Sequence, residues 1–183
     1  MRLKIKWVRR RRGMTALQAA ILTGISIAVA LIVGYWIWTV VVGSIRTERL
    51  ALSIPSAEQV DDISTYITGA SGRGWEIVLK ITNNGPSDST IVDIRVNGKG
   101  IATLDASTVY AEITINGNTY TWASGDDSPQ LGGSDVRGIP IGAGEEAEAH
   151  IYLVEDPYKA GQTIEIAFVT AANQVYTSSI ALP

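Results

Sequence analysis

The sequence predicts an α+β protein, in which a long apolar α-helix near the N-terminus is followed by an all-β immunoglobulin-like sandwich. Two patterns support this prediction. No charged side chain occurs between Arg12 and Arg46, and from Ile63 onward apolar residues alternate with polar ones at every second position. An uninterrupted apolar run indicates a helix surrounded by lipid or by other helices. A period of two is typical of half-buried antiparallel strands.

The apolar run, from Met14 to Ile45, is 32 residues long. As an α-helix it would extend about 48 Å, whereas a bilayer hydrocarbon core is ~30 Å thick and needs ~20 residues. A cleavable secretory signal has an apolar region of about 7–15 residues, so this run is too long for one. Tyr35, Trp36 and Trp38 lie toward its end, where aromatic rings suit a membrane interface; ordinary apolar filler is the alternative.

Charge is distributed unevenly along the chain. The formal net charge is −3, but residues 1–13 hold seven of the fifteen Lys and Arg and no acid. The remainder has eight basic residues against eighteen acidic ones, a formal charge of −10. An acidic body repels phosphate backbones, so nucleic acid is not an expected partner. The basic block adjoins the apolar run, which predicts a cytoplasmic N-terminus and an exported chain beyond Arg46.

Small residues recur along the apolar run at intervals of four. This ridge consists of Ala16, Ala20, Gly24 and Ala28, and the same spacing returns at Ala30 and Gly34. Small residues at i and i+4 let a second helix approach closely and gain van der Waals contact that lipid does not supply as well. We therefore predict helix packing and assembly through this ridge. Chance is the alternative, because Ala and Gly are common.

The sequence divides the rest of the chain into a linker, residues 47–62, and a β-sandwich, residues 63–183. Pro55 discourages a continuing helix, and a short strand is possible at Leu50–Ile54. The turn sequences Asn97-Gly98 and Asn116-Gly117 separate predicted strands, and residues 123–138 are expected to form a surface loop. The residues expected to face the core are Trp75, Ile77, Leu79, Ile81, Val92, Ile94, Val96, Val109, Ala111, Ile113, Ile115, Ala147, Ala149, Ile151, Leu153, Ile164, Ile166 and Phe168.

A basic cluster and a glycine stand directly before the apolar run. They are Arg9, Arg10, Arg11, Arg12 and Gly13, followed by Met14. The pattern fits a leader that is cut between Gly13 and Met14 on the cytoplasmic side, leaving the helix attached to the exported domain. An uncut signal anchor whose charges only fix topology is the alternative.

The sequence RRRRG followed by MTALQAAILTGISIAVALIVGYWIWTVVVG resembles archaeal type IV pilins and archaellins. The resemblance implies a class III signal peptide at residues 1–13. It also implies a helix at residues 14–46 that is membrane-embedded before assembly and lies in the filament core afterwards. The implied partners are further copies of the chain, a prepilin peptidase, an assembly ATPase and a membrane platform protein. Many type IV pilins carry Glu five residues after the cut, where this chain has Gln18, so the Glu-to-amine pairing of that family is not carried over.

Patterns for catalysis or metal binding are weak. His150 is the only histidine and lies in phase with Glu146 and Glu148, so we expect a solvated surface residue. Asp126, Asp127 and Asp135 lack EF-hand spacing, which favours a solvated loop over a calcium site. No HExxH, GxSxG or Walker-type sequence occurs, and there is no cysteine. We therefore expect no enzyme, no cofactor and no metal.

The sequence favours a structural subunit of an extracellular archaeal type IV pilus that polymerises through its N-terminal helix and serves adhesion at the cell surface. Two alternatives remain. One is an archaellum filament subunit. The other is a single-pass, membrane-anchored β-sandwich that binds a cell-wall layer, a sugar or a protein, as stator-like proteins do. A membrane-anchored enzyme has almost no support.

Overall fold

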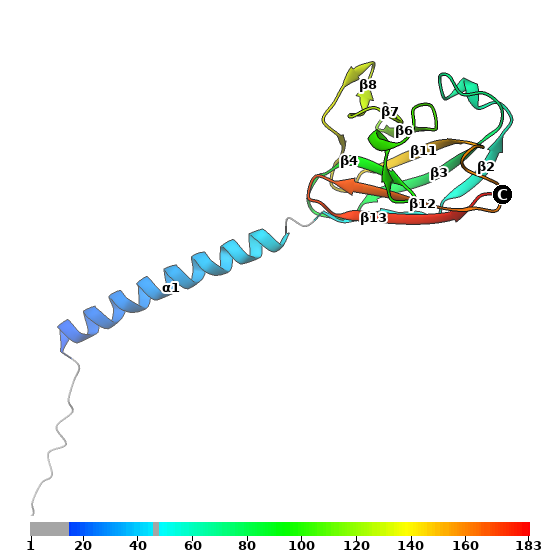
Figure 1. Ribbon diagram of the computed structural model, residues 1–183. Helices are drawn as coiled ribbons and strands as arrows, with labels where there is room; N and C mark the ends of the chain where they lie inside the picture. Colours follow the sequence, from blue (N-terminus) through cyan, green and yellow to red (C-terminus); the bar gives the residue numbers. More distant parts are fainter. Residues whose placement is uncertain (1–14, 46–47) are drawn as a thin grey trace, which may run out of the picture. The chain divides into compact units, whose positions relative to one another are not determined.

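The computed structural model describes residues 15–45 and 48–183. The chain divides after Ser44 into two compact units, one helical and one built of strands (Figure 1). The predicted processing site, Gly13 and Met14, and the leader charges Arg9–Arg12 lie outside the described residues.

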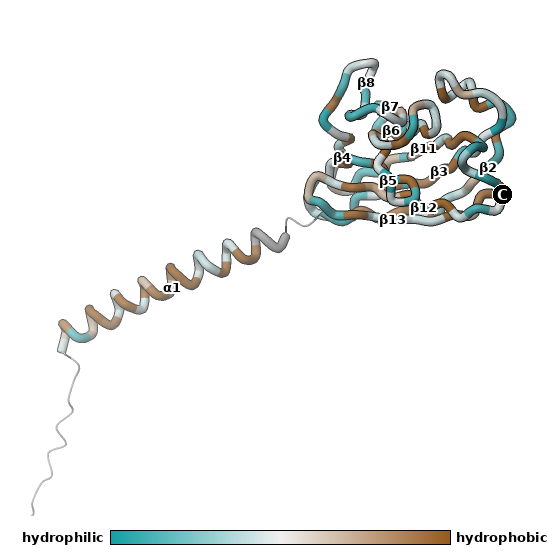
Figure 2. The backbone as a smooth tube through the Cα atoms, in the orientation of Figure 1, coloured by the Kyte–Doolittle hydropathy of each residue, from teal (hydrophilic) through white to brown (hydrophobic). Residues whose placement is uncertain are grey.

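The helical unit is α1 (Ala16–Ile45), a single helix of 30 residues. At ~1.5 Å per residue it is about 45 Å long. Its segment Ala16–Val41 is long and apolar enough to cross a membrane, and none of its side chains is buried within the chain. Apolar residues recur along its whole described length (Figure 2). A helix that is apolar all round needs lipid or other helices as its surroundings.

The second unit is a sandwich of two antiparallel sheets, as the sequence predicts (Figure 1). The first sheet has eight strands in the order β1-β3-β11-β6-β7-β8-β9, with β2 also paired to β3: β1 (Leu50–Leu52), β2 (Ser56–Val60), β3 (Gly74–Asn83), β11 (Glu146–Val154), β6 (Val109–Ile115), β7 (Asn118–Ala123), β8 (Gln130–Leu131) and β9 (Ser134–Asp135). The second sheet has five strands in the order β10-β4-β12-β13, with β5 also paired to β4: β10 (Ile139–Ile141), β4 (Ser89–Val96), β12 (Thr163–Thr170), β13 (Val175–Ala181) and β5 (Lys99–Gly100). Two short 3-10 helices, η1 (Ile63–Thr65) and η2 (Ile101–Thr103), lie in the connections.

The core between the sheets contains the residues that the period-two pattern places inward, with one exception. Trp75, Ile113, Ile151 and Phe168 are among the buried side chains of one continuous apolar cluster that draws on both sheets. Burial of such side chains supplies roughly 1.5–3 kcal/mol each relative to exposure. The sandwich therefore has a core of its own.

The exception is Val92, which the alternation in β4 places inward but which is 37% exposed. The register between β4 and β12 shifts at this point, because Val169 pairs with Asp93 whereas Thr170 pairs with Ile91. Two steps along β4 thus match one step along β12, which is a β-bulge. The extra residue reverses the alternation, so that Ile91 is buried in place of Val92.

Residues 48–62, predicted to be a linker, contain the edge of the first sheet. Strand β1 pairs with the end of β3, Leu50 opposite Asn83, and β2 pairs with its beginning, Val60 opposite Gly74. Between β1 and β2, Ser53 continues the hydrogen bonding to β3. Its amide donates to the Lys80 carbonyl at 2.9 Å, and its hydroxyl accepts from the Lys80 amide at 2.9 Å. β1 and β2 therefore form one edge, interrupted before Pro55.

The predicted tight turns are confirmed. Asn97 and Gly98 have φ of 51° and 80°, and Asn116 and Gly117 have φ of 49° and 81°. Two consecutive positive φ values define the type I′ turn that suits a two-residue hairpin. The second turn joins β6 to β7, with Ile115 opposite Asn118. The loop expected at residues 123–138 includes the short strands β8 and β9.

Candidate assembly surface on the N-terminal helix

Helix α1 begins with a reciprocal cap. The amide of Thr15 donates to the Gln18 side-chain oxygen at 3.2 Å, and the amide of Gln18 donates to the Thr15 hydroxyl at 3.4 Å. This Thr-x-x-Gln arrangement is a capping box, which satisfies two of the amides that a helix start leaves unpaired. Gln18 therefore has a local structural role in starting the helix.

Polar side chains within α1 are satisfied by the helix itself. Thr23, Ser26 and Thr39 donate their hydroxyls to the carbonyls of Ala19, Leu22 and Trp36 at 2.9, 2.8 and 2.8 Å. A hydroxyl without a partner would cost several kcal/mol in an apolar environment. These internal bonds let the helix surface lie against lipid or another helix without a polar penalty.

The six predicted packing residues do not lie on one straight line of α1. At about 100° per residue, Ala16, Ala20, Ala30 and Gly34 fall within an arc of about 80°. With the same rotation per residue, Gly24 and Ala28 lie about 80° and 120° around the helix from Ala16. The ridge of four-residue steps therefore winds around the helix and offers close approach on more than one side.

The two glycines of this ridge have no contact within the chain that requires them. A Cβ added at Gly24 or Gly34 would meet nothing within 4 Å. Glycine inside a helix costs about 1 kcal/mol relative to alanine. Because nothing inside the chain offsets that cost, the glycines favour a use outside it, such as the close approach of another helix.

Three aromatic residues lie within one turn near the end of α1. Tyr35, Trp36 and Trp38 are 73%, 65% and 68% exposed. Their different directions around the helix fit a ring of aromatic side chains at the boundary between lipid and water. They equally supply large apolar area to a neighbouring helix.

In the β-sandwich, His150 lies on the outer face of the first sheet, on the face predicted for it, but it is only partly solvated. Its Nδ1 atom is 2.8 Å from the Glu76 carboxylate, which also accepts a hydrogen bond from the Tyr152 hydroxyl at 3.1 Å. Burial, followed by the hydrogen bond to Glu76, raises the pKa of Tyr152 above its usual range. The arrangement ties β3 to β11 beneath Tyr66, whose ring stacks on that of Tyr152 at 4.0 Å.

Tyr152 belongs to a second buried cluster that the sequence pattern does not reveal. Ile63 and Ile67 pack on it from the segment that precedes β3. Tyr152 alternates with the core residues Ile151 and Leu153 along β11, but a chain segment covers this part of the outer face. The signal available in the sequence is the pair of isoleucines that follows the apparent linker.

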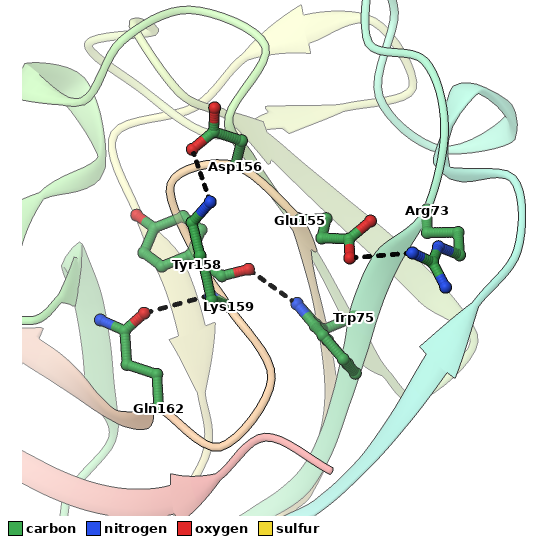
Figure 3. Close-up of polar contacts among 7 residues, drawn as sticks. All are labelled: Arg73, Trp75, Glu155, Asp156, Tyr158, Lys159 and Gln162. Carbon is green, nitrogen blue, oxygen red and sulfur yellow. Dashed lines mark hydrogen bonds and ion pairs between the residues drawn. The ribbon is translucent and has the colours of Figure 1, made fainter.

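A hollow of about 670 Å³ lies at one end of the sandwich. Gly74 and Val154 pair at this end, whereas Leu50 pairs with Asn83 at the other, so the hollow lies opposite the point where the chain enters the sandwich. Its cations face acids: Arg73 is 3.2 Å from Glu155, and Lys159 is 3.9 Å from Asp156 (Figure 3).

The charged groups of this hollow are two cations and two acids, all from solvent-exposed pairs. Such pairs contribute about 0–1 kcal/mol each and leave no net charge with which to select an ion. Beneath them Trp75 donates its indole N–H to the buried Tyr158 carbonyl at 2.9 Å (Figure 3). In residues 15–45 and 48–183, no three His, Cys, Asp or Glu side chains group as metal ligands.

The sequence matches no family profile and no curated protein. Among solved structures, a flagellar-like filament, Iho670, is similar over 91% of this chain and 98% of the filament's own chain, with 14% identity and a TM-score of 0.38. At that TM-score the likeness carries no argument about this chain.

Proposed function

We propose that the protein is the structural subunit of an extracellular type IV pilus, assembled through α1 and serving adhesion. The observation that supports this most is the helix itself. It is apolar along its length, and it includes two glycines, Gly24 and Gly34, without a use inside the helix.

The length of α1 favours a filament core over a simple anchor. The helix is about 45 Å long, and tilt absorbs only part of the excess over a ~30 Å hydrocarbon layer. In a bundle of such helices the whole length is buried. The free-energy gain is that of exchanging lipid for protein, so it depends on close packing and not on the hydrophobic effect.

The proposed cycle needs no chemistry from the subunit. The leader is cut between Gly13 and Met14 by a prepilin peptidase, and a separate ATPase and membrane platform protein drive assembly. The acidic sandwich, outside the membrane, forms the filament surface. A pilus is preferred to an archaellum because nothing in the sequence marks a motor-driven role; a membrane-anchored binding module would not need the ridge.

The experiment replaces residues of the ridge but keeps the helix apolar, so that insertion into the membrane is unchanged. Ala20→Leu with Gly34→Leu adds bulk where close approach is proposed, and Ala20→Ser with Gly34→Ala keeps both positions small. Overpacking a contact costs about 1–3 kcal/mol, so the leucine variant should yield at least about tenfold less filament in sheared fractions. The small-residue variant should yield filaments within about twofold of the unmodified chain.

Immunoblots of the membrane fraction provide the control for expression, since both variants keep an apolar helix. Equal membrane levels with loss of filaments only in the leucine variant support assembly through the ridge. Normal fibres from the leucine variant would show that the ridge has no part in assembly. Gly24→Leu with Ala28→Leu applies the same test to the part of the ridge that winds to the other side.

A further inference from the structure

The edges of the two sheets are protected from pairing with other strands, with one exception. The β1–β2 edge is broken before Pro55 and carries Glu58, and β9 has two residues, one of them Asp135. In the second sheet, β10 has three residues with Pro140 at the centre. Short length, charge and proline are the usual means by which an exposed edge avoids association.

Strand β13 has none of these protections. It runs for seven residues, Val175–Ala181, and the stretch from Gln174 to Leu182 contains no charge and no proline. In the described part of the chain, β13 sits at the end of the second sheet and pairs with β12 alone. Its inward side chains, Tyr176, Ser178 and Ile180, are half-buried where β13 lies close to β1 and β2 of the first sheet, and its other side chains are exposed.

The charge of this edge fits a second copy of the same chain. Beyond residue 13 the chain carries a formal charge of −10, so most surfaces of two copies repel each other. Strand β13 itself carries no charged side chain. The nearest acid on the adjoining strand is Glu165, opposite Ser179. In a joined sheet the two Glu165 residues would lie three strand spacings apart, about 14 Å, which exceeds the Debye length of ~8 Å.

The sequence of β13 also matches itself in the antiparallel direction. If Ser178 of two copies lie opposite each other, Thr177 faces Ser179 of the other copy and Tyr176 faces Ile180. Val175 then faces Ala181. Each pair joins side chains of like exposure on the same face, since Val175, Thr177, Ser179 and Ala181 are all exposed. Hydroxyl–hydroxyl and aromatic–aliphatic pairs are favourable cross-strand neighbours.

We propose that β13 is a homotypic docking edge, at which the β13 strands of two copies pair antiparallel about Ser178 and join their second sheets. The contact is two-fold symmetric, with the same patch used by both copies. It does not depend on filament formation. If the chain does form a polar filament, as proposed above, copies within it are related by a screw operation, and this two-fold contact then joins the heads of two filaments.

The absence of cysteine in the chain allows a direct test. The full-length protein in detergent micelles is given a single cysteine, Ser178→Cys, and oxidised. Opposite residues of antiparallel strands have Cα atoms about 4.5–5.5 Å apart, which suits a disulfide. We expect disulfide-linked dimers on a non-reducing gel in roughly fivefold excess over controls with a cysteine elsewhere.

Two control variants test whether the excess of disulfide-linked dimers comes from pairing of the β13 strands. Val175→Cys lies on the same strand, but in the proposed register its two copies are about 20 Å apart. Ser134→Cys lies on the exposed edge β9 and measures random collision within micelles. Equal dimer yields from Ser178→Cys and either control would overturn the proposal.

A mixture of two variants tests the register on exposed side chains. Thr177→Cys and Ser179→Cys, each alone, should dimerise weakly, whereas the mixture should give the heterodimer. Homodimers in equal or greater yield would overturn the proposed register. Because these measurements are made in micelles, their failure leaves the filament experiments unaffected, and the reverse also holds.

Discussion

Glu48, three residues beyond the end of α1, accepts a hydrogen bond from the Ser89 hydroxyl at 2.7 Å. Its second carboxylate oxygen accepts from the Thr170 hydroxyl, and its backbone carbonyl accepts from the Tyr176 hydroxyl at 3.3 Å. These bonds tie the chain to β4, β12 and β13 of the second sheet, and the next residues pair with β3 of the first. A force applied to the chain at this point is therefore shared by both sheets.

The first prediction concerns this tie. Glu48→Ala leaves the hydroxyl of buried Ser89 without its acceptor, and leaves that of buried Thr170 with only the Gln174 carbonyl at 3.5 Å. Hydrogen bonds to a charged group contribute about 1.5–3 kcal/mol, so the free energy of unfolding of the sandwich should fall by about 2 kcal/mol. Denaturant titration followed by tryptophan fluorescence measures the change. Glu165→Ala, an exposed carboxylate on β12, should change it by less than about 0.5 kcal/mol; equal effects from both substitutions would contradict the tie.

Ionisation of Tyr152 lowers the free energy of unfolding of the sandwich at alkaline pH. Its pKa is raised, by burial first and then by the hydrogen bond to Glu76, so the folded chain holds this proton to higher pH than the unfolded chain. The corresponding contribution is fully present below the unfolded pKa of ~10 and is lost as the pH rises above it. Burial raises the pKa of Tyr110 and Tyr158 in the same direction.

The measurement is the free energy of unfolding at pH 8 and pH 11 for the unmodified chain and for Tyr152→Phe. At pH 8 the variant should be less stable by about 1 kcal/mol, because the bond to Glu76 is lost. Between pH 8 and pH 11 the variant should lose less stability than the unmodified chain. Identical losses would show that Tyr152 has no part in the loss of stability at alkaline pH.

The capping box predicts a local effect at Gln18. Gln18→Ala removes the acceptor for the Thr15 amide, which should weaken the first turn of α1 by about 1 kcal/mol. Hydrogen exchange of the Thr15–Ala19 amides in micelles should then quicken by about fivefold. Gln18→Glu keeps the reciprocal cap and adds a favourable charge at a helix start, so it should leave exchange slow. Fast exchange in both variants would show that the cap does not set this stability.

The sequence predicted the helix and most strands because their periodicities are long and regular. The predicted core positions of β3, β6, β11 and β12 alternate along each strand, and the structure buries them; in β12 it buries Ala167 and Val169 as well. The error at Val92 arose because a one-residue bulge changes the phase of a strand without changing its composition. Residues 48–62 read as a linker because Pro55 interrupts a short edge that is fixed by pairing to β3 and not by its own pattern.

The candidate assembly surface was predictable in composition but not in shape. Four-residue spacing identified Gly24 and Gly34, while the open space around both glycines is visible only in the structure. The cap formed by Gln18 and the cover over Tyr152 depend on side-chain placement, for which single residues give little signal. To recognise that the edge of β13 is unprotected likewise requires the strand order, which the sequence does not provide.

The most direct test of assembly through a processed helix is intact-mass spectrometry of the chain recovered from sheared surface fibres. We expect an abundant chain that begins at Met14, because the leader is removed and α1 stays attached to the sandwich. The membrane fraction should contain only the subunits that are not yet assembled into fibres. A chain that keeps Arg9–Arg12 and remains with the membrane, without fibres, would contradict the account.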